Sequence, residues 1–206
     1  MKDLIIVCAG GFGKEAVVVA EQMNEIVPQW NILGFIDDTI EVGTEIFRGY
    51  KIIGSIKDWQ PEPQQYFAMG ISTPQAKEKL YNLIHEKGGK FATLIKPATI
   101  VPQETEIGEG CVISGWIGIN VVLGKCVHIA GSMVGGASIG DFSTTTGFAN
   151  IAGAHLGNRV FVGSHAVILN GKKVGDDAIV CAGSIVFSNV KAGTKVFGNP
   201  AKKADF

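Results

Sequence analysis

The chain has 206 residues, of which 46% are hydrophobic and 18% charged, so it can bury a sizeable core and intrinsic disorder is excluded. Its formal net charge of -1 gives no bulk attraction to a phosphate backbone, and we expect no nucleic-acid partner. No apolar run reaches the about 18 residues that a membrane-spanning helix needs. The short apolar start is followed at once by glycines and charges, which predicts a cytoplasmic protein without a signal peptide or membrane span.

The segment 1–90 alternates between the patterns of buried strands and of helices. The predicted strands cover residues 4–8, 32–36 and 66–71, the predicted helices cover 14–23 and 74–87, and a short extended stretch at 51–54 precedes a short helix at 56–59. Pro74 suits the first turn of the second long helix. This order predicts an α/β domain, residues 1–90, in which helices cover a small parallel sheet that is half of a Rossmann sheet.

A glycine-rich turn joins the first predicted strand to the first helix. Gly10, Gly11 and Gly13 allow a close approach of the backbone, and the start of a helix presents free N–H groups that suit a phosphate or pyrophosphate. The spacing is G-G-x-G instead of G-x-G-x-x-G, so the dinucleotide fingerprint is absent. Asp37 and Asp38 end the second strand, where carboxylates can accept hydrogen bonds from a nucleoside. The alternative is a helix-capping turn beside a solvated acidic loop.

From about residue 91 the helix patterns vanish and a period of six residues appears. Aliphatic residues recur at steps of six without a miss, at Leu156, Val162, Ile168, Val174, Val180 and Val186. An α-helix cannot produce this period, and a β-sandwich would need six accidental hits in a row. A triangular β-helix explains it, because each side of a coil points one aliphatic side chain inward. We therefore predict that residues 91–206 form an all-β domain of stacked coils.

This period resembles the left-handed β-helix of hexapeptide acyltransferases. Together with AGGFGKE at 9–15, FIDD at 35–38 and GNPAK at 198–202, the chain resembles bacterial sugar acyltransferases of the sialic-acid O-acetyltransferase and bacillosamine N-acetyltransferase type. The resemblance implies a homotrimer, acetyl-CoA as donor, no metal, and a sugar or nucleotide-linked amino sugar as acceptor in surface-glycan biosynthesis. It also implies a nucleotide-sugar site formed by Gly10, Gly11, Phe12, Asp37, Asp38 and Gly70.

The chain departs from the resembled family at the catalytic centre. The family base, a His beside a carboxylate, aligns with Gly135 and Gly136, and no His or acid remains in that segment. His155 follows by roughly one coil of about eighteen residues, so we predict it as the substitute base. We predict His165 as the second candidate and Asp141 as an acidic partner.

The two other histidines are expected outside the site. His85 lies on a predicted helix and is expected to be solvated. His128 precedes the inward position Ile129, so its side chain is expected to point away from the β-helix core.

For the acyl donor, the resemblance implies a groove between the coils of adjoining subunits. Its expected CoA contacts are Thr144, Ser164, Ala182 and Gly183. Several lysines could meet the CoA phosphates or form a solvated face, namely Lys172, Lys173, Lys195, Lys202 and Lys203. Exposed aliphatic side chains on the β-helix, taken to be Ile117, Val121 and Val122, also predict self-association.

The four cysteines form no C-x-x-C pair, and each lies in an apolar context. Buried free thiols are therefore the expected state, ahead of metal ligands or disulfides.

Three function classes stay open. The first is an acetyl-CoA-dependent sugar acetyltransferase. The second is a related acyltransferase with another acyl group or acceptor, which works by positioning without the usual base. The third is a non-catalytic nucleotide-sugar-binding or partner-binding trimer that has lost the family His.

Overall fold

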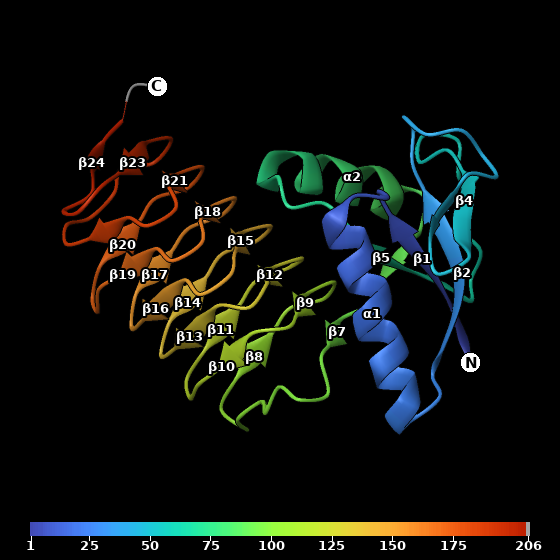
Figure 1. The fold of residues 1–206 in the computed structure, drawn as a ribbon, viewed down its shortest axis with the longest axis horizontal. Coiled ribbons are helices and arrows are strands. Elements are labelled where there is room, and N and C mark those ends of the chain that lie inside the picture. Colours follow the sequence, from blue (N-terminus) through green and yellow to red (C-terminus); the bar gives the residue numbers. More distant parts are fainter. Residues whose placement is uncertain (205–206) are drawn as a thin grey trace.

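The computed structural model describes residues 1–204 of the chain. An α/β part comes first, and a three-sided β-helix follows it (Figure 1). The α/β part lies against the first coils, while the later coils extend away from it toward the C-terminus (Figure 1). The two parts meet along α1 (Gly11–Ile26) and α2 (Pro74–Glu86). The contact begins at the early strands of the β-helix and reaches the later coils, where Arg159 pairs with Glu78 and Asp177 accepts from Gln75.

The sheet of the α/β part has the strand order β3-β4-β2-β1-β5-β6. Its strands are β1 (Lys2–Val7), β2 (Trp30–Ile36), β3 (Glu45–Phe47), β4 (Tyr50–Gly54), β5 (Gln65–Met69) and β6 (Lys90–Phe91). All neighbours pair in parallel except β3, which is antiparallel to β4. The predicted parallel sheet is confirmed.

Two details of the sequence prediction are wrong. The strand β3 was not expected, and residues 56–58 form a turn instead of part of a helix. The carboxylate of Asp38 accepts hydrogen bonds from the main-chain N–H groups of Ile56 and Lys57 and so holds this turn at the end of β2.

The helices α1 (Gly11–Ile26) and α2 (Pro74–Glu86) cover opposite faces of the sheet. Leu4 and Ile6 of β1 pack in the cluster that contains the buried side of α1, whereas Ile5 packs with Tyr81 of α2. This alternation is the period of two that a strand buried on both faces requires. Among residues 1–204, neither helix combines the length and the hydrophobicity needed to cross a lipid bilayer.

The three faces of the β-helix are named here by what marks them. The docked face carries β7 (Leu94–Ile95), β9 (Val112–Ile113), β12 (His128–Ile129), β15 (Thr144–Thr145), β18 (Phe161–Val162), β21 (Ile179–Val180), β23 (Lys195–Phe197) and β24 (Lys202–Lys203). The His155 face carries β8 (Glu106–Ile107), β11 (Val122–Leu123), β14 (Ser138–Ile139), β17 (His155–Leu156) and β20 (Lys173–Val174). The Trp116 face carries β10 (Trp116–Ile117), β13 (Met133–Gly135), β16 (Asn150–Ala152), β19 (Val167–Ile168) and β22 (Ile185–Val186).

One aliphatic column fills the β-helix. The residues of the six-residue period are all buried in one cluster, with Leu156 at 4% exposure and Val162 at 0%. The predicted coil is therefore confirmed. The prediction that Ile117 and Val121 lie on the outside is wrong, because both point into this column and are at most 2% exposed. Of that group only Val122, at 42%, faces outward.

Candidate functional site

The glycine turn lies between β1 and α1, at the carboxyl edge of the first sheet. Gly10 is the N-cap of α1 and provides no side-chain cap, and the first turn of the helix contains no acidic residue. Among the described residues, the main-chain N–H groups of Gly11, Phe12 and Gly13 have no hydrogen-bond acceptor, and Lys14 is the first to bond back, to Gly10. Three free donors at the positive end of a helix dipole form an anion-binding geometry.

The glycines of this region serve different purposes. A Cβ atom on Gly13 would lie 2.3 Å from the carbonyl oxygen of Cys8, and one on Gly70 would lie 2.5 Å from the same atom. Packing alone therefore requires glycine at these two positions. A Cβ on Gly11 would meet nothing within 4 Å, and one on Gly10 only a carbonyl oxygen at 4.0 Å. These two glycines leave open space above the turn, where a ligand can approach the main chain.

Asp37 fastens the end of β2 to this turn. Its Oδ2 accepts a hydrogen bond from the N–H of Ala9 at 3.0 Å, and its Oδ1 accepts from the N–H and hydroxyl of Thr39 at 2.8 and 2.6 Å. Burial acts to raise the pKa of Asp37, but the hydrogen bonds from Thr39 and Ala9 outweigh it and the pKa is lowered. Both oxygens already have protein donors, so Asp37 shapes the edge of the site as an ionised carboxylate.

Asp38 leaves one oxygen available. Its Oδ1 accepts from the Ser55 hydroxyl at 2.7 Å and from the N–H of Ile56 at 2.8 Å, whereas no bond within residues 1–204 uses Oδ2. Burial acts to raise its pKa, but the hydrogen bonds, together with the charge of Lys57, lower it. Asp38 is therefore an ionised acceptor at the site. Cys8 is not a nucleophile here, because burial, followed by the charges of Asp37 and Asp38, raises the pKa of its thiol to about 12.

The turn is held against the docked face of the β-helix. The ring of Phe12 stacks on that of His128 with 5.4 Å between centroids and 12° between planes. Glu15 of α1 accepts a hydrogen bond from Ser114. His128 does point away from the β-helix core, as predicted, but the α/β part covers it to 1% exposure. His85 is exposed on α2, as predicted, with its ring stacked on Tyr81.

A second contact between the α/β part and the docked face lies next to the stack of Phe12 on His128. The buried amine of Lys77 donates to the carbonyl oxygen of Ser143 at 3.1 Å and to the hydroxyl of Thr144 at 2.8 Å. Thr144 in turn donates to the carbonyl oxygen of Ser72 at 2.7 Å. Thr144 is fully buried, so its expected contact with CoA has no surface to occur on in this conformation. Its hydroxyl joins the two parts of the chain instead.

His155 stands on its own face of the β-helix. Its Nδ1 lies 2.9 Å from the hydroxyl of Ser138, its partner on the preceding coil. The side chain is exposed at the rim of a cavity of about 570 Å³ that Lys173 and Val190 also line. Stacking does not place His155 over Gly135, whose partner on the next coil is Ala152.

Asp141 has a structural role at a corner of the coil. Its Oδ1 accepts from the N–H of Lys125 at 2.8 Å, and its own N–H donates to the side chain of Asn158. Asn158 is bonded in the same way to Asp176 on the next coil. These hydrogen bonds between coils use the carboxylate of Asp141, which was predicted to pair with His155. In the described residues, the side chains of Asp141 and His155 form no hydrogen bond with each other.

Three of the four predicted CoA contacts lie together at one corner, between the docked face and the Trp116 face. The N–H of Gly183 donates to the carbonyl oxygen of Ser164 at 2.8 Å, so the two residues stack on successive coils beside Ala182. Ala182 and Gly183 are exposed, and a Cβ on Gly183 would meet nothing within 4 Å. His165 belongs to the same corner, with its ring stacked on Phe148 at 5.1 Å. This corner presents small side chains and main chain to solvent.

The aligned position of the family base is covered by a residue that sequence reasoning missed. A Cβ on Gly135 would lie 3.3 Å from the six-membered ring of Trp116, which is itself 59% exposed. Gly136 has a φ of 58°, a value that favours glycine. An indole therefore lies where the sequence suggested only an empty turn. The one signal for it was an aromatic residue at an outward position of the period.

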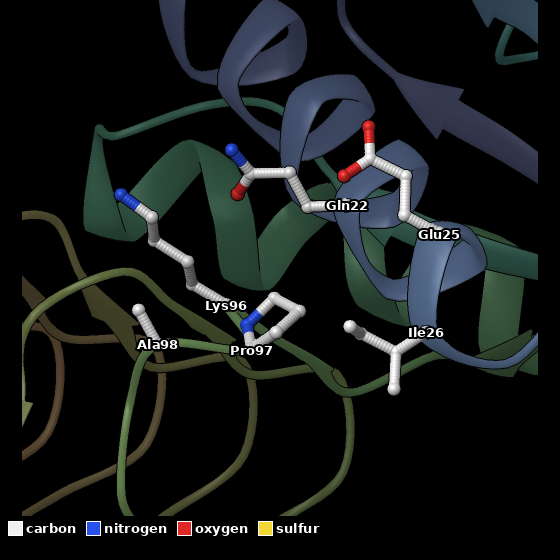
Figure 2. A pocket seen from close by; sticks show the side chains of 6 residues that line it. All are labelled: Gln22, Glu25, Ile26, Lys96, Pro97 and Ala98. Carbon is white, nitrogen blue, oxygen red and sulfur yellow. The ribbon is translucent and has the colours of Figure 1, made fainter.

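A further hollow lies at the opposite end of α1. Figure 2 shows it between the last turns of that helix, where Gln22 and Glu25 project, and the segment that follows β7, with Lys96 and Pro97. Its volume is about 190 Å³. It is remote from the glycine turn, which starts α1, and we assign it no part in the site.

Comparison with known proteins covers the whole chain. Residues 3–84 match the family described as the PglD N-terminal domain. GDP-perosamine N-acetyltransferase of Escherichia coli O157:H7 is 27% identical to the chain, and the alignment covers 95% of this chain and 93% of that protein.

Solved structures agree over the same length. WeeI from Acinetobacter baumannii AYE superposes with a TM-score of 0.87 at 28% identity, covering 99% of this chain and 100% of that one. The acetyltransferase domain of PglB from Neisseria gonorrhoeae FA1090, in complex with acetyl coenzyme A, superposes with a TM-score of 0.77 at 25% identity, covering 98% and 99%. The α/β part and the left-handed β-helix thus form a single shared architecture.

Proposed function

We propose that this chain, which belongs to the bacterial hexapeptide-repeat sugar acyltransferases, transfers an acetyl group from acetyl-CoA to a nucleotide-linked sugar. The observation that carries the proposal is the β1–α1 turn, with three free N–H groups on Gly11, Phe12 and Gly13 below open space. Such a turn suits the diphosphate of a nucleotide sugar. The relative named GDP-perosamine N-acetyltransferase acts on a substrate of this class.

The two parts of the chain divide the work in this proposal. The α/β domain, residues 1–90, holds the nucleotide through its glycine turn, with Asp38 accepting a hydrogen bond from the nucleoside. The β-helix domain, residues 91–206, holds the donor. Ser164, Ala182 and Gly183 give the pantetheine arm a corner of small residues, where it can bond to main-chain groups.

The acyl transfer needs a base for the acceptor. The acceptor amine or hydroxyl attacks the thioester carbonyl, its proton passes to the base, and the CoA sulfur leaves and is protonated. We assign the base to His155. When Nδ1–H donates to the hydroxyl of Ser138, Nε2 carries the lone pair that accepts the proton. His165, at the donor corner, is the second candidate.

We further propose a homotrimer in the cytoplasm. Two apolar pairs lie on the Trp116 face, Trp116 with Met133 and Val167 with Ile185, and Asn150 stands between them in the same register. Trp116 is 59% exposed and Met133 is 45% exposed. Exposed apolar pairs of this kind support self-association, and His155 and the donor corner, which lie on different sides of one chain, can then meet across subunits.

A second function is favoured by the absence of the family base. Gly135 and Gly136 provide no side chain, and Trp116 covers the first of them. A trimer that binds a nucleotide sugar or a protein partner without catalysis would show this arrangement.

A thiol-release assay decides between the two functions. The protein is incubated with acetyl-CoA and a panel of UDP-, GDP- and dTDP-linked amino sugars, and released CoA is followed together with the mass of the sugar product. Thiol release with an acetylated product supports the transferase. Calorimetric binding of a nucleotide sugar without any thiol release supports the binding trimer.

A further inference from the structure

The contact between the two parts of the chain contains two buried basic side chains, and among residues 1–204 neither forms an ion pair. Lys77 is 0% exposed and His128 is 1% exposed. Neither ring nitrogen of His128 makes a hydrogen bond of standard geometry, although the main chain of Met69 lies nearby. Buried polar groups are normally hydrogen-bonded, so an orphaned imidazole calls for a reason.

The position of His128 supplies that reason. Its register partner on the next coil is Thr144, so the two residues are neighbours on the docked face. His128 meets Phe12 in the turn that follows β1, and Thr144 meets Ser72 in the segment that follows β5. These two segments flank the open space above Gly10 and Gly11. His128 and Thr144, which are stacked on the docked face, thus contact the two segments that border the proposed nucleotide site.

We infer that His128 is a positioning residue, which acts through its ring stack on Phe12 to fix the glycine turn in its anion-binding conformation. The inference rests on the proposed nucleotide-sugar site and adds a coupling to it. The turn is shaped by the β-helix as well as by its own domain. Lys77 is the matching fastener for the segment after β5, through Thr144.

Burial beside the amine of Lys77 favours a neutral imidazole. Burial, followed by the charge of Lys77, lowers the pKa of His128 well below its usual range. The thiols of Cys111 and Cys126 on the β-helix act on Lys77. The other titratable groups of this contact are Glu15 of α1, which accepts from Ser114, and Tyr81 of α2, which donates to Glu109. Because the folded pKa of His128 lies below the unfolded one, docking is unaffected at neutral pH and weakens as acid protonates the ring.

The test compares His128→Ala with His128→Phe. The Phe variant keeps a planar ring and removes titration. Hydrogen exchange of the Lys14 amide, which bonds back to Gly10 and closes the glycine turn, is measured without ligand, and calorimetry gives the affinities for a nucleotide sugar and for acetyl-CoA. An aromatic stack contributes about 1 kcal/mol, so His128→Ala should speed exchange and weaken nucleotide-sugar binding by about fivefold, with CoA binding unchanged.

His128→Phe should restore both values and keep them as the pH falls below about 6.5, where the wild type loses affinity. His85→Ala is the matched control, because it removes a stack on Tyr81 with the same 12° between ring planes, away from the turn. Wild-type exchange and affinity in His128→Ala would overturn the inference. A wild type that binds no nucleotide sugar would overturn the proposed function, while exchange would still decide the positioning role.

Discussion

The carbonyl oxygen of Cys8 occupies the space beside Gly13, where a Cβ atom would lie 2.3 Å away. Cys8 itself adopts a φ of 72°, an unusual value for a residue with a side chain. The main chain after β1 therefore bends tightly to bring α1 onto the sheet. Two positions further back, Gly11 faces open space. The same short motif thus contains one glycine required by the fold and one available to a ligand.

We predict that substitution of Gly13 lowers stability and that substitution of Gly11 leaves it nearly unchanged. Gly13→Ala should lower the free energy of unfolding by about 1–3 kcal/mol, because the clash is with rigid main chain. Gly11→Ala should change it by less than about 0.5 kcal/mol, since nothing opposes the added methyl group. Urea denaturation measures both, and equal losses would contradict the distinction.

Binding should show the reverse order. Gly11→Trp should abolish nucleotide-sugar binding while the β-helix stays folded, because the indole fills the open space above the free N–H groups. Calorimetry measures the affinity, and circular dichroism checks the fold. Unchanged affinity in Gly11→Trp would exclude this turn as the binding site.

Lys77 predicts a rise of stability with pH. Burial lowers the pKa of its amine from 10.5 to about 7. Between these values the unfolded chain binds more protons than the folded one, so the free energy of unfolding rises by up to about 1.4 kcal/mol per pH unit above pH 7. Below pH 7 the amine is protonated in both states, and the cost of burying the charge is constant.

Denaturation at about pH 7.0 and 8.0 measures this slope. The thiols of Cys8, Cys111 and Cys126 oppose it as the pH nears about 8.5, where unfolded thiols ionise, because burial raises their pKa values in the folded chain. The contribution of Lys77 is therefore read from the difference between the wild type and a variant. Lys77→Met should flatten it relative to the wild type. Lys79→Met removes an exposed lysine from the same helix and should leave the slope as it was. Equal slopes in all three proteins would show that Lys77 does not titrate as described.

The fold was predictable because its signals are periodic. Steps of six placed Leu156 and Val162 in the core, and the short apolar run at 4–8 marked a central strand. The site was less predictable, because stacking fixes only which residues follow one another on adjacent coils. The sequence could not show that Thr144 is covered by α2 or that Asp141 bonds to a corner amide. Both depend on contacts between segments far apart in the chain.

The Trp116 face should be the contact between subunits. Met133→Lys places a charge in the exposed apolar pair with Trp116 and should shift the trimer toward monomer, because an unpaired charge is costly to bury in an interface. Asn82→Lys adds the same charge to the exposed side of α2 and should leave the trimer intact. Light scattering measures the mass, and a monomeric wild type would remove both the trimer and a donor site between subunits.

The last prediction concerns the base. General-base assistance is typically worth about a hundredfold or more, so His155→Ala should lower kcat at least that far with little change in the affinity for acetyl-CoA. Ser138→Ala should cause a smaller loss, because the hydroxyl at 2.9 Å orients the ring without receiving the proton from the acceptor. His165→Ala should mainly weaken CoA binding, since His165 stands at the donor corner. Full activity in both histidine variants would show that neither replaces the family base. If the wild type transfers acetyl to no amino sugar or sugar alcohol, the Gly135–Gly136 turn is the mark of a lost activity and the binding trimer becomes the better function, because binding by the glycine turn needs no base.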